Sequence, residues 1–383
     1  MDFYSNPHNL IPRENNYVLN NKLLSIHSED RDINKWPESN HFEIELPQTV
    51  TNVQSIQLVK IHLPGNQYTF SNNQQNTKLS FYLIPNKYNN ISLQLALEAN
   101  NNVPFNITIR EGYYSPAEMA NELENLMNQE VTRFLIEDAS LNNSIVYDKF
   151  KVHYDRVGMK LFFGNTHDNF SFPFDKQIHY DVSCSKFAIN NDEVWNRYTN
   201  WGLGSYLGFN KSAYKGIEIT KPYYFNYANT MWLSPDTLDI SDNSIAKAYY
   251  IESSFTVNIF GDTCIYMDMD KYNTIDELVP FSKETSNLYN NDYGGKVNSA
   301  FAKIPIMSNN NNYYLASNND FLSNISSYNP IINNIKKLKF KFRYHDGRLV
   351  EFKESNFNFT LCFSELREEI KSNYNVRIPG GYN

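Results

Sequence analysis

The sequence predicts an all-β chain of mainly antiparallel strands, folded as a jelly-roll-type β-sandwich. Aromatic residues make up 15% of the 383 residues, including 28 Tyr and 26 Phe, and such side chains favour pleated, half-buried surfaces. Asn gathers between the aromatic runs, as at Asn309–Asn312, and Asn favours turns. Several short segments alternate apolar and polar residues, which is the pattern of strands with one solvated face.

The chain divides into an arm, one large β domain and a tail. Residues 1–20 are polar and irregular, and they are predicted to form an N-terminal arm. Residues 21–365 are predicted to form the β-sandwich, with a helix insertion at about 115–135 and loop elaboration at about 271–330. Residues 366–383 are predicted to form a C-terminal tail. We see no linker long enough to separate two domains.

The first strands follow an acidic opening loop. In HFEIELP, residues 41–47, the apolar positions alternate from Phe42, and Glu43 and Glu45 occupy a wet face. The apolar phase shifts midway through residues 53–63, which predicts a β-bulge or burial on both faces. Further strands are predicted at residues 79–84, 105–109, 149–154, 160–164, 169–172, 253–260, 264–270 and 302–306.

One amphipathic helix is predicted, beginning after Ser115 and ending near Phe134. Ser115 suits the N-cap, Pro116 suits the first helical position, and Glu118 completes a capping box. A single apolar stripe follows at i, i+4, i+7 and i+8, formed by Met119, Leu123, Leu126 and Met127. We therefore expect this helix to lie on a sheet.

A hairpin near the C-terminus is the clearest strand signal, and its register can be predicted. A two-residue loop at Asp346–Gly347 would oppose Phe342 and Glu351. A three-residue loop at His345–Gly347, with Gly347 left-handed, opposes Phe342 and Val350 instead. We expect the second register because it keeps apolar with apolar and unlike charges together. It also opposes Phe340 with Phe352 and Lys341 with Glu351, and apolar residues alternate again at Phe357, Phe359, Leu361 and Phe363.

A basic row lies on the other face of this hairpin and is the candidate interface of the chain: Lys337, Lys339, Lys341 and Arg343. Such a row is usually solvated, but it could meet an acidic neighbour in an assembly or, with less support, phosphates. Glu351 partly neutralises it, and the formal charge of the whole chain is -8. Both facts argue against a protein that coats nucleic acid.

No catalytic residue, metal ligand or cofactor site is predicted. The eight His form no H-E-x-x-H pair, and the glycines of Gly202–Gly208 lack the spacing of a nucleotide fingerprint and predict a turn. Asp268 and Asp270 lack the glycine of a calcium loop and fit the wet face of a strand. We expect the acidic cluster around Arg31 to form a local Asp–Arg bridge or to cap a turn; its members are Glu29, Asp30 and Asp32.

Cysteine use and the N-terminal composition indicate a reducing compartment. Cys184, Cys264 and Cys362 lie far apart, in odd number, without the spacing of a zinc site. The first residues lack the layout of a signal peptide, and no apolar run reaches the length of a membrane span. We therefore expect neither secretion nor a transmembrane segment.

In the opening of the chain, Arg31 and Asp32 are followed by Pro37 and Asn40, then by the strand FEIELP and by the strand NVQSIQL, which leads to Pro64. In this order, the motifs resemble the openings of capsid-associated β-proteins of nucleocytoplasmic large DNA viruses. Those openings read roughly as serine-x-acid-Arg-Asp, then Pro and Asn before an F-x-I-x-L-P strand, then an N-V-x-S-I-x-L strand ending in Pro. His27-Ser28 stands where that family has an Asp. Similar stretches follow in order at 111–128, 207–209, 301–306 and 342–363. The matching opening residues are Arg31, Asp32, Pro37, Asn40, Phe42, Ile44, Leu46, Pro47, Asn52, Val53, Ser55, Ile56, Leu58 and Pro64.

The resemblance implies a jelly-roll-like minor capsid protein of giant viruses, either a vertex (penton) subunit or a component beneath the facets. It brings no catalytic residues with it. It implies a place in the virion, assembly in the host cytoplasm, and partners among the major capsid protein, other capsid proteins and further copies of the chain. Separately from the resemblance, the acidic charge balance and the lack of a long apolar run predict no specific nucleic-acid partner and no membrane span.

Two other classes of function remain open from the sequence. A carbohydrate-binding or host-attachment module would use exposed aromatic side chains as sugar platforms, for example Trp195, Trp201 and Trp232. A glycan-cleaving enzyme, the less favoured of the two, would need two carboxylates that face each other across a cleft.

Overall fold

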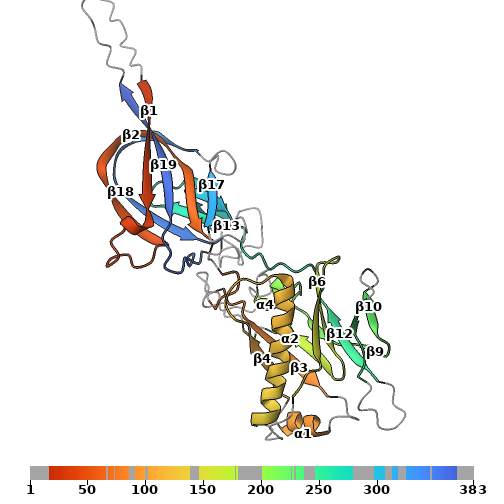
Figure 1. The fold of residues 1–383 in the computed structure, drawn as a ribbon. Coiled ribbons are helices and arrows are strands. Elements are labelled where there is room, and N and C mark those ends of the chain that lie inside the picture. Colours follow the sequence, from red (N-terminus) through yellow and green to blue (C-terminus); the bar gives the residue numbers. More distant parts are fainter. Residues whose placement is uncertain are drawn as a thin grey trace, which may run out of the picture.

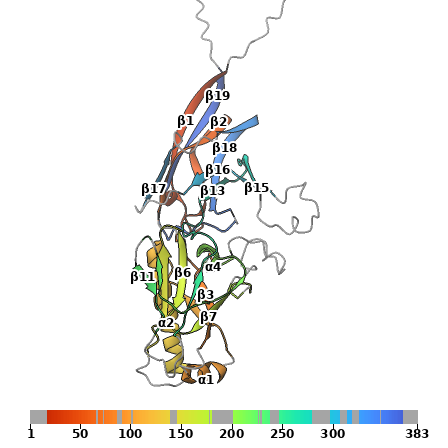
Figure 2. The ribbon, with the colours of Figure 1, turned by 90° about the vertical axis from the view of Figure 1, so that its right-hand side faces the viewer.

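The computed structural model contains two lobes that lie end to end (Figure 1 and Figure 2). We call residues 17–65 and 263–368 the terminal lobe and residues 68–260 the inserted lobe. The predicted fold class is confirmed, because the chain is mainly strands and every described strand pair is antiparallel. The structure describes residues 17–65, 68–72, 74–85, 91–99, 102–138, 146–176, 178–179, 201–225, 227, 230–236, 246–278, 297–306, 313–317, 325–345 and 347–368.

The terminal lobe is built on one curved, seven-stranded sheet. Its strands are β1 (Tyr17–His27), β2 (His41–Pro64), β13 (Cys264–Met269), β16 (Ala302–Pro305), β17 (Tyr313–Ser317), β18 (Ile325–Arg343) and β19 (Asn358–Glu368). Their order across the sheet is β1-β19-β2-β18-β13-β16, and β17 also pairs with β2. A short 3₁₀ turn and a two-stranded sheet complete the lobe: η1 (Ser28–Asp30), β14 (Ile275–Leu278) and β15 (Val297–Ala300).

Strand β2 unites the two predicted strands of this region and contains the predicted bulge. Two consecutive residues of β19, Thr360 and Leu361, pair with Lys60 and Leu58 of β2, so that Val59 is skipped in this ladder. The buried positions of β2 shift by one residue at the same point, from Ile56 and Leu58 before it to Ile61 and Leu63 after it. One extra residue therefore turns the second half of the strand over while its apolar side chains stay in the core.

The predicted three-residue hairpin loop is confirmed at its turn. Gly347 has φ +88°, in the left-handed region that favours glycine. Arg343 and Leu349 form a bridge, and the Val350 N–H donates to the Phe342 carbonyl at 3.0 Å. These contacts place Phe342 opposite Val350, as the register predicts.

The hairpin ladder does not extend to residues of β18 before Phe342, because both edges of β18 already pair with other strands there. Phe340 pairs with Phe42 of β2 on one side and with Met269 of β13 on the other. A strand has only two edges, so the expected pairs of Phe340 with Phe352 and of Lys341 with Glu351 are wrong.

The inserted lobe contains two four-stranded sheets. The first has the order β4-β3-β7-β8 and the second the order β5-β6-β12-β9, with a β10–β11 hairpin beside them. The strands are β3 (Lys78–Ile84), β4 (Phe105–Thr108), β5 (Phe150–Asp155), β6 (Lys160–Asn165), β7 (Asn169–Pro173), β8 (Ala213–Lys215), β9 (Ile217–Ile219), β10 (Tyr223–Phe225), β11 (Thr230–Leu233) and β12 (Ala248–Glu252). The helices are α1 (Ile91–Ala99), α2 (Pro116–Arg133), η2 (Phe134–Asp138) and α4 (Leu203–Tyr206).

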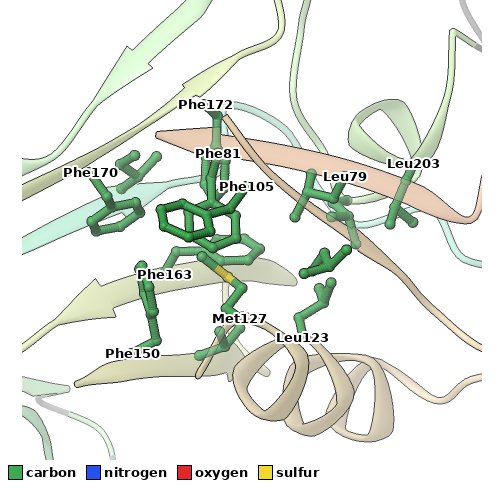
Figure 3. Close-up of a cluster of buried hydrophobic side chains, with 14 of the residues drawn as sticks. Leu79, Phe81, Phe105, Leu123, Met127, Phe150, Phe163, Phe170, Phe172 and Leu203 are labelled. Carbon is green, nitrogen blue, oxygen red and sulfur yellow. The ribbon is translucent and has the colours of Figure 1, made fainter. Parts of the chain in front are cut away.

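Aromatic rings from both sheets fill the core of the inserted lobe. The rings of Phe81 on β3 and Phe150 on β5 lie 5.2 Å apart, and those of Phe163 on β6 and Phe172 on β7 lie 5.0 Å apart. Edge-to-face contacts of this kind add stability beyond the burial of the rings. Figure 3 shows side chains of α2 pointing toward these rings, so the helix closes the space between the two sheets.

Helix α2 begins as predicted, but the lobe also contains elements that the sequence did not reveal. The Glu118 N–H donates to the Ser115 hydroxyl, and the Ser115 N–H donates to the Glu118 carboxylate, which completes the capping box. The expectation of a single helix is wrong, because α1 and the short α4 are also present. The predicted strand at residues 253–260 is wrong too, since the strand of that region, β12, ends at Glu252.

Buried side chains form two separate clusters, one in each lobe. The division into an arm, one sandwich over residues 21–365 and a tail stays a prediction. β1 begins at Tyr17 and β19 ends at Glu368, so both strands reach past the predicted ends of the sandwich. Strands β14, β15 and β17 lie within the predicted loop region, and residues 1–16 and 369–383 lie outside the described residues.

Candidate functional site

The basic row of β18 lies between two acidic strands and is not a uniform solvated face. Lys337 and Lys339 stand opposite Glu45 and Glu43 of β2, and Lys337 lies 3.5 Å from both carboxylates. On the other side, Lys341 stands opposite an aspartate of β13. Cross-strand pairs of opposite charge stabilise a sheet, and here they compensate much of the charge of the row. Its role as an interface stays a prediction.

Arg343, the fourth residue of the row, is only 1% exposed, so its expected place on a solvated face is wrong. Its Nε lies 3.0 Å from Asp268 Oδ2, and its Nη1 lies 2.6 Å from Glu277 Oε2. The guanidinium also lies 5.1 Å from the Tyr266 ring. A buried guanidinium needs such partners, because an unpaired buried charge is strongly destabilising.

The surroundings of Arg343 form a linked polar cluster, which we call the Arg343 cluster. It joins β13, β14 and β18 through Asp268, Glu277 and Arg343. Glu277 also contacts the partly exposed ring of His345. Burial, followed by the nearby Cys264 and Glu277, raises the pKa of Tyr266. The cluster anchors the β14–β15 sheet to the main sheet, and the sequence missed it because Glu277 lies in a region predicted to be loops.

An aromatic side chain and several cations gather at the start of β2. The Lys35 and Lys339 ammonium groups lie 5.5 Å and 5.2 Å from the centre of the Trp36 ring. The His41 ring lies 4.8 Å from the same ring. Burial lowers the pKa of His41, and the charges of Lys339 and Lys341 lower it further. This corner therefore favours neutral His41 and contacts between cations and an aromatic ring.

The opening loop is held by Arg31 rather than by an Asp–Arg bridge. The Arg31 guanidinium donates to the backbone carbonyls of Ser28, Trp36 and Pro37 at 2.6–3.0 Å, and to Asn356 Oδ1 at 3.1 Å. These bonds tie the loop to the residues that lead into β19.

The aspartates beside Arg31 cap turns, as one of the two expectations proposed. Asp30 accepts from the His27 N–H at 3.2 Å, and Asp32 accepts from the Asn34 N–H at 3.0 Å. Both carboxylates therefore serve the local backbone.

A second buried polar network lies in the inserted lobe. The Tyr147 hydroxyl donates to Asp168 Oδ2 at 2.9 Å, and Asn165 Nδ2 donates to the Tyr147 oxygen at 2.8 Å. The His167 ring lies 3.1 Å from the other Asp168 oxygen. Burial raises the pKa of Tyr147 well above its usual value, and the charge of Asp168 adds to this effect. All four side chains are buried, so the network fits a structural role.

The described residues offer little support for a sugar platform or a metal centre. Trp201 is only 8% exposed and packs on Phe174, while Trp232 packs against Phe162 and Phe225. Trp195 lies outside the described residues. No group of three metal-binding side chains occurs within the part of the chain that the structure describes.

An open cleft of about 580 Å³ runs between α2 and the start of β5. Its charges are paired, because Lys151 lies 3.2 Å from Glu124 and Arg133 lies 3.0 Å from Glu137. The cleft is therefore polar but has no strong excess of one charge. Among the described helices, none combines the length and the apolar character that crossing a membrane requires.

Comparisons with known proteins return likenesses of structure. The chain is similar to a viral penton protein. The selenomethionine-labelled mavirus penton protein matches with a TM-score of 0.40 and 9% identity, over 91% of this chain and 99% of that one. A chain in the 3.5 Å cryo-EM structure of the Sputnik virophage matches with a TM-score of 0.37 and 10% identity, over 90% and 98%. No protein-family model matches this chain, and no curated protein does.

Proposed function

We propose that this chain is a viral structural protein, a minor component of an icosahedral capsid that acts through protein–protein interfaces. Its role would be to present surfaces that bind neighbouring capsid proteins, without catalysing a reaction. Its partners would be the major capsid protein, other capsid proteins and further copies of the chain.

The observation that carries the proposal is what the family-like residues do in the fold. Arg31 ties the opening loop to the loop before β19, and Phe42 packs on Phe340 in the core of the terminal lobe. Ser115 and Glu118 cap the main helix of the inserted lobe. The residues that resemble the capsid family therefore maintain the scaffold instead of surrounding a ligand. This is expected of a protein with a structural role.

Two features of the surface agree with a role in assembly. The described ends of the chain lie together at one tip of the terminal lobe, as Figure 2 illustrates. Large apolar side chains are at least half exposed on both lobes, among them Leu23 on β1, Tyr224 on β10 and Met231 on β11. Exposed apolar groups of this size mark contact surfaces when they gather in patches. Either a vertex or a position beneath a facet would use them.

The decisive experiment is to locate the protein in purified particles. Quantitative mass spectrometry of gradient-purified particles from infected cells should detect the chain at a fixed ratio to the major capsid protein. Immunogold labelling of the same particles would then separate vertices from facets. Absence from the particles, with the chain recovered only from the soluble fraction of infected cells, would refute the proposal.

A further inference from the structure

Strand β1 is a long edge strand of the described sheet, and it has little of the usual protection against pairing. It pairs with β19 over eleven residues in unbroken register, from Tyr17–Glu368 to His27–Asn358. On its other side, no strand pairs with it within the described part of the chain. Natural edge strands are normally protected by lysines, prolines or bulges. In β1, Lys22 is the single lysine, and there is no proline and no register shift.

The tip of β1 also projects beyond the rest of the sheet. The pairing of β19 with β2 ends at Glu365 and Val53, so the first residues of β1 belong to a two-stranded ribbon. Figure 1 shows this ribbon extending from the terminal lobe. Leu19 and Leu23 on one face are 56% and 64% exposed, and Val18 on the other face is 51% exposed. An isolated two-stranded ribbon is only marginally stable in water.

We propose that β1 pairs antiparallel with β1 of a second copy of this chain, around a two-fold axis that passes beside Asn21. The two curved sheets then join into one continuous sheet, in which the free N–H and C=O groups of both edges are satisfied. The contact is isologous, because each copy contributes the same strand.

The apolar pattern of β1 selects this register. With the axis at Asn21, Leu19 stands opposite Leu23 of the partner subunit, and the same pair forms a second time. On the other face, Val18 stands opposite Leu24 of the partner subunit. An axis one residue later would place Lys22 opposite its own copy, and like charges directly opposite are destabilising. The axis at Asn21 thus pairs apolar with apolar on both faces.

Charge complementarity favours the same partner. Lys22 then stands opposite Asn20 of the partner subunit. Within one subunit, Asn20 Nδ2 donates to Glu365 Oε2 at 3.4 Å, and Asn20 and Glu365 are direct neighbours across β1 and β19. Each Lys22 therefore lies in the same row, and on the same face, as Glu365 of the partner subunit, which also lies 3.0 Å from Arg367 of its own chain. Lys22 and this carboxylate are two strands apart, so their attraction is a weak addition to the apolar pairs.

Two double variants that differ at one residue test the register. In Leu19→Lys with Leu23→Lys, lysines oppose lysines across the axis, and the dimer should dissociate at least about tenfold more readily. In Leu19→Glu with Leu23→Lys, each glutamate opposes a lysine of the other copy, and the dimer should persist. Both side chains are more than half exposed, so the monomer fold should be unaffected, which circular dichroism and the melting temperature would verify.

The masses are measured on the full chain by sedimentation velocity over a range of concentrations. Leu278→Lys on β14, at a residue 61% exposed in a sheet separate from that of β1, is the matched control and should leave the dimer unchanged. A wild-type chain that is monomeric or pentameric would overturn the inference, as would double variants that dissociate equally. The measurement needs no particle, so its failure is distinguishable from failure of the capsid proposal.

Discussion

Each lobe encloses a core between β-strands, but the paired strands are far apart in the sequence in one lobe and close together in the other. In the terminal lobe, strands from opposite ends of the described chain pair directly, as β1 and β19 do from Tyr17–Glu368 onward. The inserted lobe is made from one continuous stretch, and neighbouring strands such as β5 and β6 form a hairpin around Asp155 and Lys160. Long-range pairing costs more chain entropy before its contacts form. The comparison indicates that the inserted lobe can close alone, whereas the terminal lobe needs both ends.

Truncating one core ring in each lobe should have the largest effect and test whether the lobes unfold separately. Phe81 of the inserted lobe and Phe340 of the terminal lobe are both fully buried. Phe81→Ala and Phe340→Ala should each lower the free energy of unfolding of their own lobe by about 3–5 kcal/mol. Hydrogen exchange read by mass spectrometry would locate the loss of protection. Equal loss in both lobes from either variant would mean that the chain unfolds as one unit.

Removing the buried guanidinium should destabilise the terminal lobe by a comparable amount. Arg343→Met leaves the Asp268 and Glu277 carboxylates without their cation, at a cost of about 3–5 kcal/mol. The matched control is Lys337→Met on the same strand, where the pair with Glu43 is exposed, screened by solvent and expected to contribute little. Urea denaturation of both variants measures the difference. Equal effects would show that the Arg343 cluster adds no more than a surface pair.

Loss of the helix cap should have a smaller effect, confined to the inserted lobe. Ser115→Ala removes the hydroxyl that accepts from the Glu118 N–H and should cost about 1 kcal/mol. Ser212→Ala, at an exposed serine of the same lobe, is the control and should be neutral. Urea denaturation followed by circular dichroism at 222 nm would compare them. A neutral Ser115→Ala would mean that packing of α2 alone sets its start.

Acidification should weaken both lobes slightly, but with a different response to salt. Burial lowers the pKa of His153, which stacks on Phe225 at 4.6 Å, and outweighs the charge of Asp155, which raises it, so the unfolded chain takes up the proton first. Stability should therefore fall as the pH drops below about 6.5, the usual pKa of histidine. The pKa of His41 is lowered by burial and also by Lys339 and Lys341, and salt screens only the lysine part.

The pH effect is measured as the urea midpoint at pH 7.5 and pH 5.0, at low and high salt. His153→Phe should flatten the pH dependence of the inserted lobe at both salt concentrations. His41→Phe should flatten that of the terminal lobe more strongly at low salt. Salt also screens Asp155, so the His153 effect should not shrink at high salt, and an effect that did shrink would contradict burial as its main cause.

Local sequence patterns predicted the elements whose cause lies within a few residues. The capping box at Ser115, the left-handed Gly347 and the bulge near Val59 all follow from short spacings. Helix α1 was not predicted. The apolar run after Glu252 predicted a strand, but the strand of this region, β12, ends at Glu252. Such runs do not reveal which face will be covered, because tertiary packing overrides propensity.

The candidate interface was the least predictable part, because charge alone does not reveal burial. The alternation of the hairpin placed Lys337 and Arg343 on one face correctly, yet the first is exposed and the second is buried. The difference arises from Asp268 and Glu277, which come from strands far away in the sequence. No local pattern could indicate which lysine or arginine would meet them.

By itself, the sequence determined the class of the fold, the start of the main helix and the register of the C-terminal turn. These follow from periodicity and from backbone preferences that act over short distances. Only the tertiary structure decided that the core divides in two, that Arg343 is buried, and that β1 forms the edge of the sheet beside β19 among the described strands. Those outcomes depend on which distant strands pair with the two edges of β2 and β18. This pairing is decided only when the whole chain packs.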